Sequence, residues 1–489
     1  MEMPAYNLRI IIPEVFLFIW ATLVILLDLG TGRKNTKSLG WTAMFGLLIT
    51  GVLLCVTWGG ITFNNMYTSD ALSVLFKVIF LGAAFMAIGS SFGILTDKIK
   101  NHRGEYIGLI LYSTVGMMFL ASSSELISLY IGLELTTIPL FILAAFFKDD
   151  RLSVEAGLKY FVVGAFSSAI LLYGLSLLYG LTGTTDIVQM KINLSLLFLS
   201  YGKIGPGLIL AIVMIIAGIG FKLALVPFHM WAPDVYQGSP TPITGFLSVG
   251  SKAAGIIAFS RIFVNGLIAF ADSVMKPLDW GIIVAVMAAA AMIWGNLAAI
   301  RQDNIKRMLA FSSIAQIGYI MVGMVSASEL GIASIGYYMF LYLFANMGAF
   351  AAATFFGDRT GSDKITRYAG LSQSSPAFAA CLSVFMLSLA GIPPMGGFAA
   401  KYLVFAAGIQ AGYTWLVILG LLMAVVSLYY YANVVKVMYF APSESIFDLK
   451  LSFTARLVLA IAVVGVIIFG VYPEPIIKFA LDSATAFAF

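Results

Sequence analysis

The chain contains the stretch Ile219-Gly-Phe-Lys222-Leu-Ala-Leu-Val-Pro227-Phe-His229-Met-Trp-Ala-Pro233-Asp234, in which a lysine lies inside an apolar run and a proline follows five residues later. Proline has no backbone N–H, so it ends or kinks a helix and frees a carbonyl group. At the depth of a bilayer, irregular backbone is tolerated only where protein or a water-filled cavity receives it. The stretch therefore predicts a broken membrane helix with a lysine beside the break.

The rest of the chain has the composition of a membrane protein. Its 489 residues include 28 Lys and Arg and 23 Asp and Glu, so that 10% are charged and 61% are hydrophobic. Soluble domains carry about 25% charged residues, and the mean hydropathy here is +0.99. The apolar runs are about 20 residues long, which is the length of a transmembrane helix rather than of a barrel strand. We expect an all-α polytopic membrane protein.

Fourteen apolar segments are long enough to cross the bilayer. The twelfth is too long for one straight span and carries Gly391-Ile392-Pro393-Pro394 in its middle, which predicts a second broken helix. We expect the longest loop at about 182–203 and no long amphipathic helix after position 472. The fourteen segments are 10–29, 39–59, 71–96, 106–123, 124–147, 157–181, 204–228, 240–265, 278–300, 305–326, 331–357, 372–408, 413–440 and 453–472.

The basic residues of the loops predict the orientation of the chain. Eighteen of the 28 Lys and Arg residues fall in odd-numbered loops, whereas the even loops and both ends hold only Arg9, Lys191, Lys203, Lys276 and Lys478. Cytoplasmic loops carry an excess of Lys and Arg, so we expect both termini on the outer side. The eighteen are Arg33, Lys34, Lys37, Lys98, Lys100, Arg103, Lys148, Arg151, Lys159, Arg301, Lys306, Arg307, Arg359, Lys364, Arg367, Lys436, Lys450 and Arg456.

Cysteine and histidine are too few and too scattered to hold a cofactor. Cys55 and Cys381 are far apart in the chain, and His102 and His229 each stand alone. Structural zinc sites and iron–sulfur clusters need about four such ligands. We therefore expect no cofactor and no metal in this chain, and the absence of a basic run gives no indication of nucleic-acid binding.

Four charged residues lie deep in apolar segments, and they are Glu134, Lys222, Lys252 and Lys401. A charge at the centre of a membrane helix costs about 2.5–3.5 kcal/mol on insertion scales, so it needs a partner, water or a function. Lys77 and Arg261 also lie in apolar segments but closer to an end. We expect the long stem of Lys77 to reach back to the interface and Arg261 to be structural.

A lysine close to a glutamate at this depth can act as a proton switch. Burial disfavours the charged lysine and a nearby carboxylate favours it, so a lysine under both influences can take up and release a proton. The charge of one lysine also affects the protonation of the next, so a row can pass a signal. Residues that could hold water beside the row, or simply join helices by hydrogen bonds, are Thr136, Thr137, Ser248, Ser251, Ser312, Ser313, Gln316, Tyr342 and Asn346.

The two breaks predict an internal repeat. Pro227 follows Lys222, and Lys401 lies within about two turns of Pro393 and Pro394. The interrupted spans are five apart, and because five is odd the second copy must run inverted in the membrane. We expect N-terminal helices 1–3 in 1–105, a first repeat of helices 4–8 in 106–265, a second repeat of helices 9–13 in 266–440 and helix 14 in 441–489.

His229 lies just past the first break and has two interpretations. It is either an interfacial histidine bonded to backbone or a proton-uptake or relay group, because histidine titrates in the physiological range.

The stretch Phe221-Lys222-Leu-Ala-Leu-Val-Pro-Phe-His-Met-Trp-Ala-Pro-Asp-Val-Tyr-Gln-Gly-Ser-Pro-Thr-Pro242 resembles the signature of the proton-translocating, antiporter-like subunits of respiratory complex I and of the related Mrp sodium/proton antiporters. Tyr130-Ile-Gly-Leu-Glu-Leu135 and the stretch that begins Glu155-Ala-Gly-Leu-Lys-Tyr160 resemble the subunit N branch of that family. The resemblance covers essentially the whole chain.

The resemblance implies fourteen helices, two inverted five-helix repeats with a discontinuous helix in each, and a hydrated row of charged groups at mid-membrane. By position, the family's glutamate of helix 5 falls on Glu134, its lysines of helices 7 and 8 on Lys222 and Lys252, and its helix-12 residue on Lys401. Lysine at the last position is typical of subunit N, whereas subunit M and one Mrp subunit usually carry glutamate.

The resemblance also implies a function and partners. The chain would be a subunit of a proton-pumping NADH:quinone oxidoreductase in the bacterial plasma (inner) membrane, with both termini periplasmic. It would move protons from cytoplasm to periplasm, driven by redox chemistry in other subunits, and would pack against membrane-arm and peripheral-arm subunits and lipid. In this hypothesis Lys222 and Glu134 form the modulated pair, Lys252 connects the half-channels and Lys401 passes the proton outward.

Two other functions stay open from the sequence. One is an Mrp-type sodium/proton antiporter subunit, which would purify with small antiporter subunits rather than with flavoprotein and iron–sulfur subunits. The other is a structural scaffold, in which the buried charges only fix the packing of helices.

Overall fold

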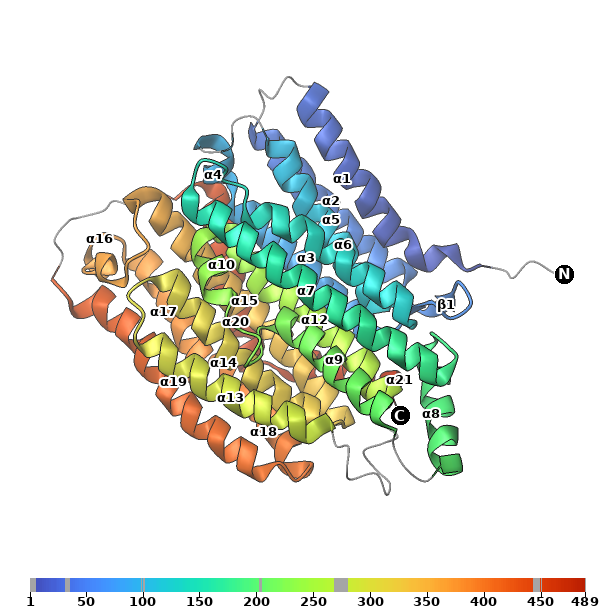
Figure 1. Cartoon of the computed structure of the whole chain (residues 1–489). Helices are drawn as coiled ribbons and strands as arrows, with labels where there is room; N and C mark the ends of the chain where they lie inside the picture. The colour runs from blue at the N-terminus through green and yellow to red at the C-terminus, as the bar shows by residue number, and fades with distance from the viewer. Residues whose placement is uncertain are drawn as a thin grey trace.

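The structure is a bundle of long helices that run side by side in alternating directions (Figure 1). The computed structural model of the chain describes residues 6–30, 36–97, 99, 102–201, 205–267, 280–442, 449 and 451–488. Of the basic residues that indicate the orientation, Arg33, Lys34, Lys98, Lys100, Lys203, Lys276 and Lys450 lie outside these residues.

The first half of the bundle includes a short β-hairpin at one end. Strands β1 (Gly60–Thr62) and β2 (Tyr67–Ser69) pair antiparallel, with Ile61 opposite Thr68. The helices are η1 (Leu8–Ile11), α1 (Ile12–Gly30), α2 (Thr36–Thr57), α3 (Ala71–Ser90), α4 (Phe92–Asp97), α5 (Arg103–Ser122), α6 (Leu126–Ala144), α7 (Arg151–Thr182), α8 (Ile187–Tyr201), α9 (Pro206–Leu223) and α10 (Ala232–Gly238).

The second half begins with a helix that contains two π-helical turns. Residues 241–266 form α11 (Thr241–Phe246), the π-helical turn η2 (Leu247–Ser251), α12 (Lys252–Phe259) and the π-helical turn η3 (Ser260–Gly266). It continues with α13 (Trp280–Ile300), α14 (Ile305–Val325), α15 (Glu329–Thr360), η6 (Ile365–Tyr368), α16 (Leu371–Ser374), α17 (Pro376–Ala390), α18 (Gly396–Gln410), α19 (Thr414–Phe440), α20 (Phe453–Val471) and α21 (Glu474–Ala488).

The fold class predicted from the sequence is confirmed. Within the described residues, 13 helices are long and apolar enough to cross a membrane. The twelfth predicted span is the pair α17 and α18, which are each 15 residues long and too short to cross alone. Together they complete the fourteen predicted spans, whereas the division into two inverted repeats stays a prediction.

Two helices were not expected from the sequence. The predicted loop 182–203 contains α8, a helix of 15 residues. A second 15-residue helix, α21, follows position 472 and packs against α3 and α15, so a short helix, although not a long amphipathic one, is present there. Both helices are shorter than a span, and hydropathy windows of about 19 residues do not detect them.

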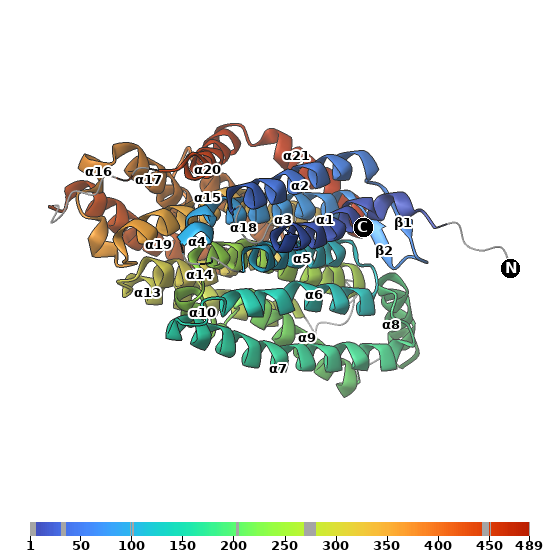
Figure 2. The same cartoon turned by 90° about the horizontal axis from the view of Figure 1, so that it is seen from above.

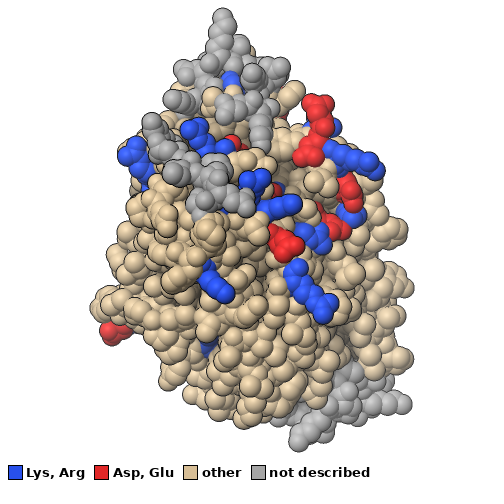
Figure 3. All heavy atoms as spheres, turned by 90° about the vertical axis from the view of Figure 1, so that its left-hand side faces the viewer, with Lys and Arg blue, Asp and Glu red and all other residues tan. Residues whose placement is uncertain are grey.

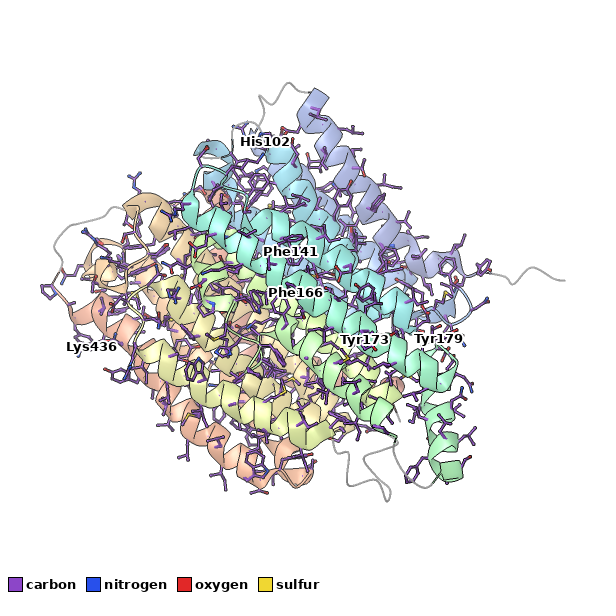
Figure 4. The ribbon with its side chains drawn as sticks, viewed as in Figure 1. His102, Phe141, Phe166, Tyr173, Tyr179 and Lys436 are labelled. Atoms are coloured by element: carbon purple, nitrogen blue, oxygen red, sulfur yellow. The ribbon has the colours of Figure 1, made fainter. Side chains whose placement is uncertain are left out.

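The burial of the helices places the centre of the bundle. The helix 241–266 is buried along its whole length, and α14 and α15 are nearly so, whereas only about a third of the residues of α1, α7 and α19 are buried. Figure 2 shows α7 along one margin of the bundle. Its residues Phe166 and Tyr173 are exposed and are labelled along its length in Figure 4. Large exposed apolar side chains are expected where a helix faces lipid.

The prediction that Lys77 reaches the interface is wrong. Lys77 and Glu14 are both fully buried, with Lys77 Nζ 2.8 Å from Glu14 Oε1, and Lys77 also donates to the hydroxyl of Tyr67 at 2.9 Å. The sequence position of Lys77 near a helix end gave no sign of Glu14, which α1 brings alongside. Arg261 is structural, as expected, because it pairs with Asp70 at 2.6 Å.

We predict that removing only one partner of the Lys77–Glu14 ion pair destabilises the folded protein, whereas removing both does so much less. Replacing Lys77 by Met leaves the Glu14 carboxylate buried and unpaired, which costs about 3–5 kcal/mol. The Lys77→Met variant should therefore unfold at a lower temperature and accumulate less in membranes. The double variant Glu14→Leu, Lys77→Met should recover most of the loss, and equal stability of the single variant and the wild type would contradict the prediction.

Candidate functional site

The two predicted breaks are present, and their backbones are alike. Helix α9 ends before Ala224, whose φ is +55°, and α17 ends before Gly391, whose φ is +89°. In each case the next N–H bonds back into the last turn, Leu225 to Gly220 O at 2.9 Å and Ile392 to Leu387 O at 3.1 Å. A left-handed residue with such bonds is a common way to end a helix.

The two lysines lie on opposite sides of these breaks. Lys222 is two residues before its left-handed residue, inside α9, whereas Lys401 is ten residues after Gly391, inside α18. Lys401 nevertheless reaches its break, because an added Cβ on Gly391 would lie 3.0 Å from Cδ of Lys401. The breaks thus match as counterparts, but the lysines do not occupy the same position relative to them.

Lys222 lies between α6 and α12. Its side chain is buried, and Nζ is 3.5 Å from the carbonyl oxygen of Leu133, the residue before Glu134. Glu134 interacts electrostatically with Lys222, but no ion pair within 4.0 Å joins them in the described residues. An added Cβ on Gly255 would lie 3.4 Å from Cγ of Lys222, so the lysine stem runs along α12. The predicted pair is therefore close without being a locked salt bridge.

Lys252 occupies the centre of the bundle. It is 1% exposed and begins α12 directly after the π-helical turn η2. Its Nζ donates to the carbonyl oxygen of Ser313 at 3.0 Å and to the Ser313 hydroxyl at 2.8 Å, and lies 5.9 Å from the ring centre of Tyr236. π-Helical turns inside α-helices are frequent at functional sites. Among the residues that the structure describes, all the partners of this lysine are neutral.

Lys401 binds the carbonyl groups that the second break frees. Its Nζ donates to Leu389 O at 3.1 Å and to Ala390 O at 2.8 Å, and lies 4.8 Å from the ring centre of Tyr319. Leu389 and Ala390 are the last residues of α17, where carbonyl groups have no partner within the helix. The ammonium group of Lys401 therefore supplies the donors that the last carbonyl groups of α17 lack, and these carbonyl groups supply acceptors for the buried charge.

Helix α14 contacts both Lys252 and Lys401. Ser313 on this helix binds Lys252, and Tyr319, less than two turns further on, faces Lys401. Sequence reasoning found Ser313 but missed Tyr236 and Tyr319, although Tyr236 lies in the stretch that carries the family signature. A tyrosine in an apolar segment carries no signal that separates it from the other aromatic residues of the core.

His229 has no hydrogen bond to Lys222, Lys252 or Lys401 within the described residues. His229 is buried between α9 and α10, and both ring nitrogens are without a hydrogen-bond partner in the described part of the chain. The centre of its ring lies 5.8 Å from that of Trp294 on α13, and the Trp294 residue is 53% exposed. His229 thus faces the margin of the bundle, and its role in proton uptake stays a prediction.

One end of the bundle carries most of the charged loops and a wide cavity. Figure 3 shows basic and acidic side chains gathered there. The cavity has a volume of about 1420 Å³ and reaches Ser239, Pro240 and Thr241 at the start of the helix that carries Lys252. At its wall, Lys306 donates to Ser239 O at 3.3 Å and lies 3.6 Å from Asp363.

Asp234 lies beside this cavity in α10 and joins three elements. Its carboxylate accepts from Lys159 of α7 at 2.7 Å and from Arg307 of α14 at 2.8 Å. Burial acts to raise the pKa of Asp234, but the hydrogen bonds and charges of Lys159 and Arg307 outweigh burial and hold the pKa below its ordinary value. The segment that follows the first break is thus tied to α14 by charged groups.

Comparisons with known proteins agree with this architecture. Residues 123–427 match the family described as NADH:quinone oxidoreductase/Mrp antiporter, TM. The chain is 42% identical over 484 residues to NADH-quinone oxidoreductase subunit N of Desulforamulus reducens, and the match covers 99% of each chain.

Two solved structures have the same fold. A chain of respiratory complex I from Thermus thermophilus is 31% identical, with a TM-score of 0.79 over 95% of this chain and 98% of that one. A chain of the Mrp complex from Dietzia sp. is similar in fold, with a TM-score of 0.80 over 98% of both chains, at 18% identity.

We predict that Asp234→Asn loosens the segment after the first break. The exposed members of this network make each ion pair worth about 1 kcal/mol or less, so amide hydrogen exchange in 235–239 should speed up by a few-fold. The pKa of Asp234 is lowered in the folded protein. The wild-type ion pairs are therefore fully formed at any pH above the ordinary pKa of an aspartate, and they are lost only as the pH falls through the lowered pKa.

Wild-type protection, corrected for intrinsic exchange rates, should therefore be equal at pH 6 and pH 8. The exposed Asp149 gives a matched control, and Asp149→Asn should leave exchange in 235–239 unchanged. Unchanged exchange in Asp234→Asn would show that the ion pairs do not hold this segment.

Proposed function

This chain belongs to the NADH:quinone oxidoreductase/Mrp antiporter family, within its subunit N branch, and from this membership we propose that it moves protons across the membrane through Glu134, Lys222, Lys252 and Lys401. It is an antiporter-like membrane subunit of an NADH:quinone oxidoreductase, and its partners are other subunits of that complex. The proposal concerns the path and the direction of the protons.

One observation carries the proposal. Three buried lysines follow one another through the bundle, and each donates to neutral oxygen atoms, those of Leu133, Ser313, and Leu389 with Ala390. Replacing an ion by a neutral amine leaves such hydrogen-bond acceptors satisfied as long as one N–H remains. Lys252 and Lys401, which have only neutral partners among the described residues, can therefore lose and regain a proton without leaving a carboxylate uncompensated, whereas Lys222 does so under the influence of Glu134.

In this proposal Glu134 controls the first lysine. Its carboxylate favours the charged form of Lys222, and displacement of either group weakens that influence. Lys222 then releases its proton, and the changed charge affects Lys252, whose helix lies along the stem of Lys222. Lys401 accepts the proton last and passes it to the outer side.

The direction follows from the predicted orientation. The excess of basic loop residues favours a cytoplasmic location for the charged end of the bundle, and the wide cavity at this end would give water access to the start of the helix that carries Lys252. Protons would thus enter from the cytoplasm and leave on the periplasmic side, where we expect both termini. The redox chemistry that drives them would take place in other subunits, with no cofactor bound by this chain.

We predict that proton pumping depends on the lysine and glutamate pair. In the assembled complex, Lys222→Met removes the titratable group and Glu134→Gln removes the controlling charge, so each should lower proton pumping and the coupled quinone reduction by at least about 10-fold. Pumping is measured from pH changes in inverted membrane vesicles supplied with NADH and a quinone.

Lys436 provides the matched control, because it is an exposed lysine near the loop end of α19 (Figure 4). The Lys436→Met variant should pump at the wild-type rate. If Lys222→Met and Glu134→Gln complexes assemble and pump at normal rates, the buried charges are structural and the proposal fails.

A further inference from the structure

A gap separates the partners of Lys252 from those of Lys401. Lys252 binds Ser313 on α14, whereas Lys401 binds the carbonyl groups of Leu389 and Ala390 at the end of α17. Backbone carbonyl groups accept hydrogen bonds but cannot release a proton. A proton that passes from one lysine to the other therefore needs hydroxyl groups or water between them.

Gln316 lies at the Lys401 side of this gap. Its side-chain N–H donates to Leu389 O at 2.9 Å, the same oxygen that accepts from Lys401 at 3.1 Å. It also donates to the hydroxyl of Tyr431 at 3.2 Å, and its amide oxygen accepts from the hydroxyl of Tyr338. Gln316 is 2% exposed, so these bonds hold the carbonyl group that binds Lys401 in one position.

Tyr342 lies at the Lys252 side of the gap. It follows Tyr338 by one turn on α15 and is fully buried. Its hydroxyl faces Ser313 but has no well-formed hydrogen bond within the part of the chain that the structure describes. A buried hydroxyl without a partner costs about 1–3 kcal/mol. A partner that the protein itself does not supply, such as a bound water molecule, would remove this cost.

A small cavity lies between these two side chains. Its wall includes Gln316, Tyr338, Tyr342, Ser388, Leu389 and Ala400, and Leu389 is the residue whose carbonyl oxygen accepts from Lys401. The space for the centre of a water molecule is about 10 Å³, which is close to the minimum that one water needs. Several polar groups line the cavity, as a buried water requires.

We propose that Tyr342 and one water molecule bound in this cavity relay protons from Lys252 to Lys401, and that Gln316 is the residue that positions the Lys401 end of this relay. The proposal rests on the proton-transfer function proposed above and names the groups that connect its last two lysines.

The relay conserves atoms and charge at each step. An N–H bond of the Lys252 ammonium group breaks as the Ser313 oxygen takes the proton. The Ser313 hydroxyl, which donates to Ala310 O at 2.7 Å, turns from that carbonyl group and releases its own proton to the Tyr342 oxygen. Tyr342 gives its proton to the water, and the water gives one to the Lys401 amine, where a new N–H bond forms. One proton moves, no electron is transferred, and Gln316 carries no proton itself.

Tyr337 on the same helix offers a comparison within the chain. Its hydroxyl donates to Phe469 O at 2.8 Å and does not line the cavity. Removing either hydroxyl by substitution with Phe changes the size of the side chain equally. The two positions therefore separate a relay function from the general effect of losing a tyrosine hydroxyl in α15.

The test measures protons pumped and NADH oxidised by the assembled complex in membrane vesicles, in H₂O and in D₂O, normalised to assembled complex. Tyr342→Phe and Gln316→Leu should each slow pumping by at least about 10-fold, and the solvent isotope effect should rise because proton transfer becomes rate-limiting. Gln316→His keeps a donor and an acceptor, so it should recover most of the activity that Gln316→Leu loses. Tyr337→Phe should resemble the wild type.

Each outcome decides the proposal. Wild-type rates and isotope effects in Tyr342→Phe and Gln316→Leu, with Lys252→Met inactive, would overturn the relay while the proposed function stands. Normal pumping by Lys252→Met and Lys401→Met would instead overturn the proposed function itself. Equal losses in Tyr342→Phe and Tyr337→Phe, or in both Gln316 variants, would mean that these side chains only pack. If Tyr342→Phe does not assemble, the two Gln316 variants still give the decision.

Discussion

The interior of a bilayer contains no water, so every charge and every free carbonyl group at that depth must be satisfied within the protein. The second break meets this requirement directly. The end of α17 leaves the carbonyl groups of Leu389 and Ala390 without partners in the helix, and the ammonium group of Lys401 binds both. A lysine alone or a broken helix alone would be costly here, whereas together they form one stable unit with an exchangeable proton.

The buried charges fall into two kinds that differ in their partners. Lys77 and Arg261 each pair with a carboxylate, Glu14 at 2.8 Å and Asp70 at 2.6 Å, which keeps their protons in place. Lys222, Lys252 and Lys401 donate to neutral oxygens instead. Of these three, Lys252 and Lys401 can change protonation without leaving a nearby carboxylate unpaired, whereas Lys222 is influenced by Glu134. This difference separates the lysines of the proposed proton path from the paired charges without reference to any relative.

The spans and breaks could be predicted from the sequence because they depend on local properties, namely the length of apolar runs and the positions of proline. Contacts between distant segments could not be predicted in this way. The pairing of Lys77 with Glu14 depends on the packing of α1 against its neighbours, and the sharing of Leu389 O between Gln316 and Lys401 joins three helices. The helix α8 was missed because it is shorter than a membrane span. The four charged residues could be named from the sequence. The oxygen atoms that accept hydrogen bonds from the three lysines could not.

The central claim is that the buried lysines change their protonation during turnover. Infrared difference spectroscopy of the assembled complex with isotope-labelled lysine, recorded before and after the addition of NADH, measures this change directly. Lysine bands should shift on reduction in the wild type and should diminish in the Lys252→Met complex. Identical difference spectra in the wild type and in Lys252→Met would contradict it.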